Sequence, residues 1–362
     1  MSTARRTSRT LLVLVSAACQ PGAAETSPFT TAPPMTSSPD ASSGSSTGST
    51  GGSSSTGGEL STGSGSGTAS TTAASTGVST FDVGTRDDFG PGKPAGCAGK
   101  IDFLFVISRY AGMGYFQAQL LDAFPKFIDT IEAKFADFDY HIMVVDGDPD
   151  WGVVTCDEKC PVQCVPDYPC NYKPTTCDTT MGAGVVFPAG DDAANKPCKI
   201  DGGRRYMTKG QTDLKATFAC AAQIGSSGRA WVGEALTTAV QPGINGPGGC
   251  NDGFLRDDAL LMVTLISNTF DYGPKPGGSK GTPDSWAAAV LAAKNDDPEA
   301  IVMFSILDPG KPECDPLDQT CQMVKKFPFS LLADVFADDY GPAFEQATEL
   351  ITEACADFVP PG

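Results

Sequence analysis

Residues Ile101-Asp-Phe-Leu-Phe-Val-Ile-Ser108 decide the fold of this 362-residue chain, because a nearly continuous apolar run ends there at polar and small residues. Such a run is typical of a strand buried on both faces of a parallel sheet. A strand, a tight loop and a helix form the first half of a βαβ unit. The helical pattern follows at once, with apolar residues at steps of three and four: Phe116, Leu120, Phe124, Phe127, Ile128, Ile131 and Phe135. Ligands bind at the carboxyl ends of such strands, so the loop from Ser108 to Gly114 is the first candidate site.

The rest of the chain repeats this alternation of strand and helix. Apolar runs predict buried strands at 139–145, 260–266 and 300–307, and helical patterns cover 213–223, 231–240, 284–294 and 342–358. We also expect a short helix at 327–336 and an interruption of the first helix at Pro125. The pattern predicts a three-layer, Rossmann-like α/β domain over residues 96–362, with a mainly parallel sheet covered on both faces.

The first strand and its loop resemble the start of a von Willebrand factor A (VWA) domain. In that family an Asp-x-Ser-x-Ser motif follows the strand and holds a cation at the metal-ion-dependent adhesion site (MIDAS). With Val106-Ile107 and Met113 aligned, the Asp falls on Ser108 and the two serines fall on Tyr110 and Gly112. The 260–266 strand with its loop, the flanking Cys220 and Cys250, and the closing helix add to the resemblance. It implies a VWA-type fold that has lost the metal ligands of its first loop.

Two further loops complete the metal site in that family. The resemblance places the family's Thr at Ser226 or Ser227 and its last Asp at Asn268. A hard divalent cation prefers several oxygen ligands with carboxylate charge among them. Hydroxyls, one amide and the nearby Arg109 do not meet that preference. We therefore expect a degenerate MIDAS with no metal and no other cofactor.

The amino-terminal residues predict export. Residues 1–18 combine three arginines with the apolar run Leu11-Leu-Val-Leu-Val15 and a small-residue ending, which is typical of a signal peptide. The ending Ser16-Ala-Ala-Cys19 resembles a bacterial lipobox, although Ser16 stands where Leu is usual. We expect lipidation at Cys19, and Gln20 after it favours the outer membrane. Plain secretion is the alternative.

Residues 19–95 separate this leader from the domain. They are mostly Ser, Thr, Gly, Ala and Pro, and such a segment cannot bury enough apolar surface to offset its ordering entropy. We expect a disordered tether with a root-mean-square span of roughly 50 Å. The net charge of the chain is −18 and becomes −21 without the three leader arginines, which argues against nucleic-acid partners.

Cysteines crowd into residues 146–200, which we expect to form a disulfide-rich insertion with little regular structure. Behind a signal peptide, disulfides are favoured over a zinc or iron–sulfur site. Without Cys19, an even number of cysteines remains for pairing in a connectivity that the sequence leaves open. They are Cys97, Cys156, Cys160, Cys164, Cys170, Cys177, Cys198, Cys220, Cys250, Cys314, Cys321 and Cys355.

Other motifs favour no catalytic site. Asp146, Asp148, Asp150 and Asp157 have partial calcium-loop spacing, but Trp151 stands where an EF-hand needs Gly, which favours a solvated acidic loop. His141, the single histidine, lies within a predicted strand and is interpreted as structural. No nucleophile has a recognisable base beside it, so we predict that the protein is not an enzyme.

These features predict an envelope-anchored binding or adhesion protein whose VWA-like domain works without metal. Its partner would be a protein or a cell-surface polymer. Candidate contact residues are those large or charged side chains that stand in the three loops: Arg109, Tyr110, Arg229, Phe270 and Tyr272. One alternative is a metal-dependent adhesin with Asp271 and Asp146 as replacement ligands. A second is a hydrolase that uses acidic residues of the insertion.

Overall fold

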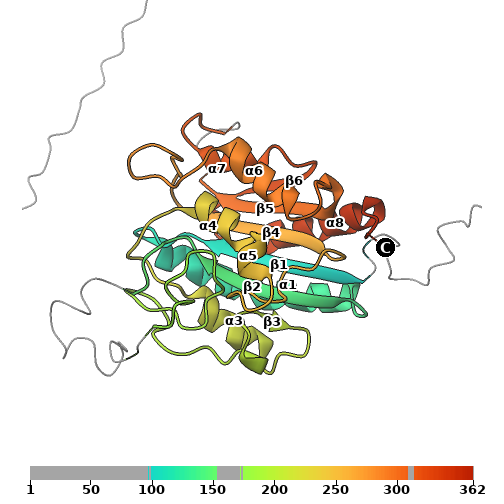
Figure 1. Cartoon of the computed structure of the whole chain (residues 1–362), viewed down its shortest axis with the longest axis horizontal. Coiled ribbons are helices and arrows are strands. Elements are labelled where there is room, and N and C mark those ends of the chain that lie inside the picture. The colour runs from blue at the N-terminus through green and yellow to red at the C-terminus, as the bar shows by residue number, and fades with distance from the viewer. Residues whose placement is uncertain (1–96, 98, 153–171, 173, 309–313, 362) are drawn as a thin grey trace, which may run out of the picture. The chain divides into compact units, whose positions relative to one another are not determined.

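A mainly parallel sheet forms around the quoted strand, β1 (Lys100–Ile107), in this computed structural model (Figure 1). The structure describes residues 97, 99–152, 172, 174–308 and 314–361. Its strand order is β3-β2-β1-β4-β5-β6, which is the doubly wound Rossmann order. The other strands are β2 (Asp139–Asp146), β3 (Met207–Thr208), β4 (Leu260–Ser267), β5 (Ile301–Leu307) and β6 (Phe329–Asp334). All neighbours pair in parallel except β3, which runs antiparallel to β2.

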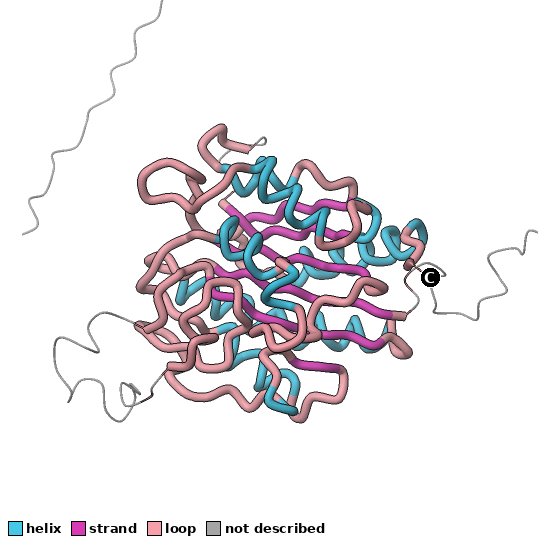
Figure 2. Tube along the Cα trace, viewed as in Figure 1, coloured by secondary structure: helices cyan, strands magenta, loops and turns pink. Residues whose placement is uncertain are grey.

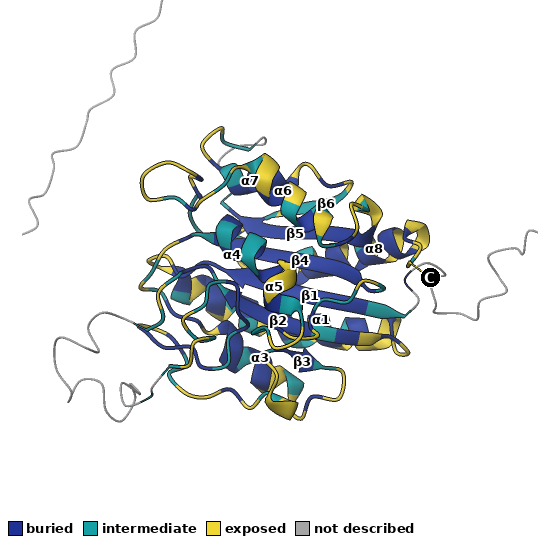
Figure 3. Cartoon of the chain, in the orientation of Figure 1, coloured by how far each residue is buried: buried dark blue, intermediate teal, exposed yellow. Residues whose placement is uncertain are grey.

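Helices cover the sheet on both faces, so the predicted three-layer α/β fold class is confirmed. Seven of β1's eight residues and every residue of β4 and β5 are buried, which is why these strands read as continuous apolar runs (Figure 3). The α-helices are α1 (Met113–Lys134), α3 (Leu214–Ala222), α4 (Val232–Ala239), α5 (Pro242–Asn245), α6 (Pro283–Ala292), α7 (Gln319–Val324) and α8 (Gly341–Asp357). Short 3-10 turns lie at η2 (Asp201–Gly203) and η3 (Pro298–Ala300).

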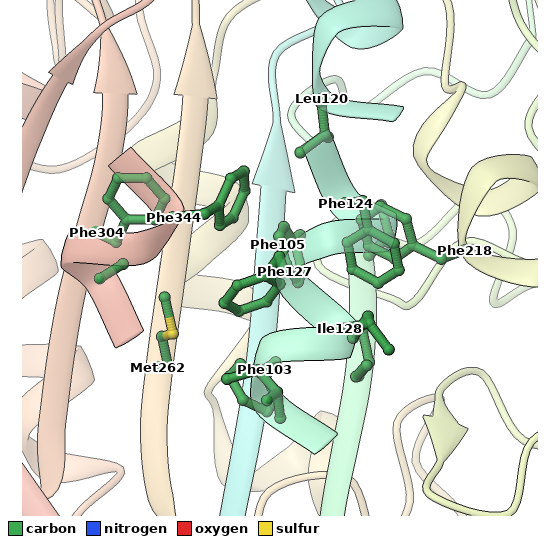
Figure 4. Close-up of a cluster of buried hydrophobic side chains, with 14 of the residues drawn as sticks. Phe103, Phe105, Leu120, Phe124, Phe127, Ile128, Phe218, Met262, Phe304 and Phe344 are labelled. Atoms are coloured by element: carbon green, nitrogen blue, oxygen red, sulfur yellow. The ribbon is translucent and has the colours of Figure 1, made fainter. Parts of the chain in front are cut away.

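Alternate residues of β1 point into two separate cores. Phe103 and Phe105 face α1, α3 and α8, whereas Leu104 and Val106 face α4, α6 and α7. Phenylalanines dominate the first core, where Phe105 lies 4.9 Å from the Phe218 ring centroid (Figure 4). On the same face, Phe344 of α8 packs against both α1 and β5, at 4.7 Å from Phe127 and 5.1 Å from Phe304. Burial of such rings supplies much of the driving force for folding.

Two predicted elements differ from the structure. The expected helix at 327–336 is instead strand β6, whose first five residues pair with β5 residues Val302–Ile306 and whose Asp334 pairs with Leu307. Tertiary pairing with the exposed edge of β5 outweighs the local helical pattern there. The first helix also continues through Pro125 without ending. A proline inside a helix removes one backbone hydrogen bond, and apolar burial on both sides of Pro125 offsets that loss.

Long loops make up most of the segment between β2 and α3 (Figure 2). Cys177 and Cys198 tie this insertion to the body of the domain through disulfides to Cys250 and Cys220. Two further disulfides join Cys97 to Cys355 and Cys314 to Cys321. The four remaining cysteines of the insertion, Cys156, Cys160, Cys164 and Cys170, lie outside the described residues, as do Cys19 and the leader.

A buried ionic cluster lies near the amino ends of β1 and β2. The Asp102 carboxylate, fully buried, accepts hydrogen bonds from the backbone N–H and Nε of Arg256, both at 2.8 Å. His141 donates through Nδ1 to the Phe254 carbonyl at 2.9 Å and lies 3.6 Å from Asp102. Burial raises the pKa of Asp102 to about 6 and lowers the pKa of His141 to about 4. His141 is therefore a structural residue of the sheet.

Within the part of the chain that the structure describes, no helix is long and apolar enough to cross a bilayer.

Candidate functional site

Three loops meet where the order of the sheet reverses, between β1 and β4. In doubly wound sheets this switch point forms the ligand crevice at the carboxyl ends of the strands. The side-chain amide of Asn268, after β4, donates to the Ala111 carbonyl in the β1 loop at 2.9 Å. Gln117 of α1 is buried and exchanges two hydrogen bonds with the backbone of Gly225, at 2.7 and 3.2 Å. The three predicted loops are therefore brought together.

The positions that the resemblance assigned to a metal already have bonding partners. Ser108 is buried and its hydroxyl oxygen accepts the Tyr110 N–H at 3.2 Å. Gly112 caps helix α1 at a φ of 84°, a conformation that a serine adopts only with strain. Asn268 turns its NH2 group toward Ala111, and its oxygen is buried without a protein partner. Ser226 donates its hydroxyl to Asp192.

This donor set does not fit a hard divalent cation. It offers hydroxyls and one amide, and the carboxylate that Ser226 contacts, Asp192, is exposed. Among the described residues, no group of three or more His, Cys, Asp or Glu side chains is arranged to hold a metal ion. No local sequence pattern marks Asp192, which lies in the insertion and reaches the loop only through the tertiary fold.

Arg109 supplies a positive charge beside these loops from within the protein. Its side chain is 1% exposed and lies 3.3 Å from the Asp146 carboxylate. The same guanidinium donates to the carbonyls of Asp150 and Ala189, each at 2.7 Å, and to that of Gly152. Arg109 therefore joins the β1 loop to both the acidic loop and the insertion. Its burial corrects the prediction that it forms part of a contact surface, because it presents almost no area to a partner.

The acidic loop after β2 is organised by hydrogen bonds within the protein. Asp146 accepts the Asp148 N–H at 2.9 Å, and Asp148 accepts the backbone N–H groups of Asp150 and Arg229. The Arg229 side chain pairs with the Asp150 carboxylate at 3.1 Å. Burial raises the pKa of Asp146 to about 7, and Arg109 opposes that rise. The fourth residue of the partial calcium pattern, Asp157, lies outside the described residues.

Asp271, the other replacement ligand considered, is also fully engaged. It is 1% exposed. Its two carboxylate oxygens accept the backbone N–H groups of Gly233, Gly273 and Ser279 at 3.0–3.1 Å and the Ser279 hydroxyl at 2.6 Å. The carboxylate thus links the β4 loop to the start of α4. Four donors leave Asp271 without a free lone-pair direction for a metal.

The described pocket beneath the acidic loop is too small for a substrate. It has a volume of about 30 Å³ and lies between Arg109, Asp146, Trp151, Phe187 and Arg205. That volume holds one or two water molecules. The nearby Asp178 carboxylate is bonded to Arg205 at 2.8 Å and to Thr175. This pocket is therefore not a substrate cleft with a free carboxylate pair.

Of the candidate contact residues, the tyrosines are the ones that present open ring surface. Tyr110 is 46% exposed and Tyr272 is 38% exposed, and Phe270 packs against Tyr272 at 6.2 Å between ring centroids. Arg229 is exposed and lies over the Trp231 ring at 4.7 Å. The carboxyl end of the sheet therefore carries aromatic and guanidinium groups beside loops that have no free metal ligand set.

Comparison with known proteins shows only distant likeness. No family model and no curated protein matches the chain. Three matching solved structures are of proximal thread matrix protein 1 from the mussel byssus, one of them with a zinc-occupied MIDAS motif. They are 10%, 11% and 10% identical, cover 72%, 70% and 72% of this chain, and give TM-scores of 0.34, 0.35 and 0.32. The chain spans about half the length of those proteins, 47–48%. At these scores the likeness carries no functional argument, and the fold class rests on the strand order and the two helical layers.

Proposed function

We propose that this chain is a metal-independent binding protein of the cell envelope, and that its domain docks a protein or cell-surface polymer at the carboxyl end of the sheet. The observation that carries the proposal is the contrast at the switch point between polar groups that bond to the protein and aromatic rings that are exposed. The hydroxyl groups of Ser108 and Ser226 and the NH2 group of Asn268 are bonded to the protein itself. The rings of Tyr110 and Tyr272, in contrast, remain exposed. Aromatic side chains of this kind dominate the energetics of protein interfaces.

The second part of the proposal is the location of the protein. The four disulfides fit an oxidising, extracellular or envelope compartment. The signal peptide, the lipid on Cys19 and the tether of residues 19–95 would place the domain at the outer membrane. All of these lie outside the described residues and rest on the sequence pattern.

The test compares partner capture by matched variants. The double variant Tyr110→Ala, Tyr272→Ala should lose most of the capture of its partner from envelope extracts, because both exposed rings are removed. The control Leu317→Ala, Leu332→Ala removes side chains of equal exposure, 46% and 39%, from the loop before α7 and from strand β6, and should capture normally. Equal capture by both variants, with unchanged melting temperatures, would move the docking surface elsewhere.

A further inference from the structure

A second exposed aromatic surface lies where α1 meets the segment after β6. Tyr115 is 63% exposed and Phe336 is 56% exposed, which are large values for such rings. The buried Phe116 lies between them, with ring centroids 5.3 Å from Tyr115 and 5.5 Å from Phe336. We call these three residues the aromatic ledge. It differs from the switch-point surface of Tyr110 and Tyr272 because it draws on α1 and on the far edge of the sheet.

The ledge is held in place from both sides. Gln119, one turn along α1 from Tyr115, donates to the Tyr115 hydroxyl at 3.2 Å and to the Ala337 carbonyl at 3.1 Å. The Phe336 N–H donates to the Asp334 carboxylate at 2.8 Å. Rings that are already ordered lose little conformational entropy when a partner binds. The exposure of Tyr115 and Phe336 is therefore that of a fixed surface.

Carboxylates neighbour both exposed residues of the ledge along the chain or across one contact. Asp334, Asp338 and Asp339 are exposed and surround Phe336 in the sequence. On the α1 side, the exposed Asp192 carboxylate lies against Gly114, where it offsets the positive end of the helix dipole. In the described part of the chain none of these four carboxylates is paired with a basic side chain. The hydrogen bond to Glu345 raises the pKa of the exposed Lys126, and the charge of Asp339 adds to that rise.

We propose that the aromatic ledge binds a Lys- or Arg-rich segment of a partner protein. Cations are attracted to the faces of Tyr and Phe rings, and neighbouring carboxylates strengthen that attraction. The net charge of −18 steers basic segments toward the molecule from a distance. An acidic partner would meet unpaired carboxylates on each side, and a purely apolar partner would leave those carboxylates desolvated without compensation.

The test uses the full chain and a fluorescent peptide of alternating Lys and Gly, with a Glu–Gly peptide as the charge control. Fluorescence anisotropy should show saturable binding of the Lys–Gly peptide that weakens as salt rises. The double variant Tyr115→Ala, Phe336→Ala keeps the net charge and should bind roughly tenfold more weakly, since two cation–π contacts are lost. The variant Asp334→Asn, Asp338→Asn keeps the hydrogen-bond acceptors and should both weaken binding and flatten its salt dependence.

Two controls separate this proposal from the proposed function. The variants Tyr110→Ala, Tyr272→Ala and Leu317→Ala, Leu332→Ala should bind the Lys–Gly peptide with unchanged affinity. If the ledge variant also binds normally, the attraction is diffuse electrostatics and the proposal is wrong. Equal binding of the Glu–Gly peptide would also overturn the proposal. So would a ledge variant that loses self-association but still binds the Lys–Gly peptide, because the ledge would then bind a second copy of this chain.

Discussion

Arg109 and Asp146 place a buried guanidinium 3.3 Å from a carboxylate at the carboxyl end of the sheet. The two residues end neighbouring strands, and the guanidinium also bonds backbone carbonyls of the acidic loop and of the insertion. A fixed cation of the protein thus organises the loops beside the positions that the VWA resemblance assigned to a metal.

Replacing Arg109 should destabilise the domain strongly. The variant Arg109→Met removes the guanidinium that binds Asp146 and three backbone carbonyls, so the free energy of unfolding should fall by about 3–5 kcal/mol. Arg229→Met is the matched control, because Arg229 pairs with the same loop at the surface and should cost about 0–1 kcal/mol. Urea unfolding followed by circular dichroism measures both. A loss of under 1 kcal/mol in Arg109→Met would show that the guanidinium is dispensable.

Chelation should leave the melting temperature unchanged. The Ser108 hydroxyl, the Asn268 amide group and the Asp271 carboxylate are bonded to the protein and do not supply a carboxylate-rich site. Differential scanning fluorimetry with and without EDTA tests this expectation. A drop that magnesium or manganese restores, and that Asn268→Ala abolishes, would contradict it.

The disulfides should contribute more to stability when they close longer loops, with a dependence that is logarithmic in loop length. The Cys97–Cys355 bridge spans 258 positions and the Cys198–Cys220 bridge spans 22. In the chain-entropy model, their removal by paired Cys→Ser changes should cost about 5 and about 3 kcal/mol respectively. Denaturant unfolding of the two double variants gives the comparison. A larger loss from the shorter bridge would show that native-state contacts dominate over loop entropy.

All twelve cysteines after Cys19 should be oxidised in the mature protein. Eight form the four described disulfides, and Cys156, Cys160, Cys164 and Cys170 provide the even remainder. Alkylation under denaturing, non-reducing conditions followed by intact-mass measurement should find no added label. Two or more labelled cysteines would show that the insertion keeps free thiols.

Asp102 and His141 should give opposite pH dependences of stability. The pKa of Asp102 is raised to about 6, so between about pH 4 and 6 the folded state binds more protons than the unfolded state. The contribution of Asp102 to stability therefore falls as the pH rises from about 4 to 6. The pKa of His141 is lowered to about 4, so the unfolded state binds more protons here. The contribution of His141 to stability therefore rises as the pH rises from about 4 to 6.5.

Single variants should separate these two slopes. Relative to the parent chain, the stability of Asp102→Asn should rise more steeply with pH over this window, because the falling contribution is gone. The stability of His141→Gln should rise less steeply or fall. Urea midpoints measured at several pH values would show this, and parallel curves for all three proteins would mean that neither group has a shifted pKa.

Local sequence patterns predict most of the strands and helices, because the burial of a strand or helix sets which residues along it are apolar. Strand β1 reads as apolar because both of its faces are covered, and α1 shows its buried stripe at steps of three and four. The pattern over strand β6 does not predict a strand, because its residues are only partly buried and its apolar and polar residues do not strictly alternate. Its conformation is decided by pairing with β5.

The sequence by itself determined the α/β class and the loops at the switch point, because strand and helix periods are local properties. It also placed no carboxylate at Ser108, Tyr110, Gly112 and Asn268, the positions that the VWA resemblance assigns to a metal. Only the tertiary structure decided what those loops do. It buried Arg109 against Asp146, occupied Asp271 with four donors, and left Tyr110, Tyr115 and Phe336 exposed. The partners of Arg109 stand 37 to 80 positions away along the chain, so no local pattern could reveal that its charge is neutralised inside the protein.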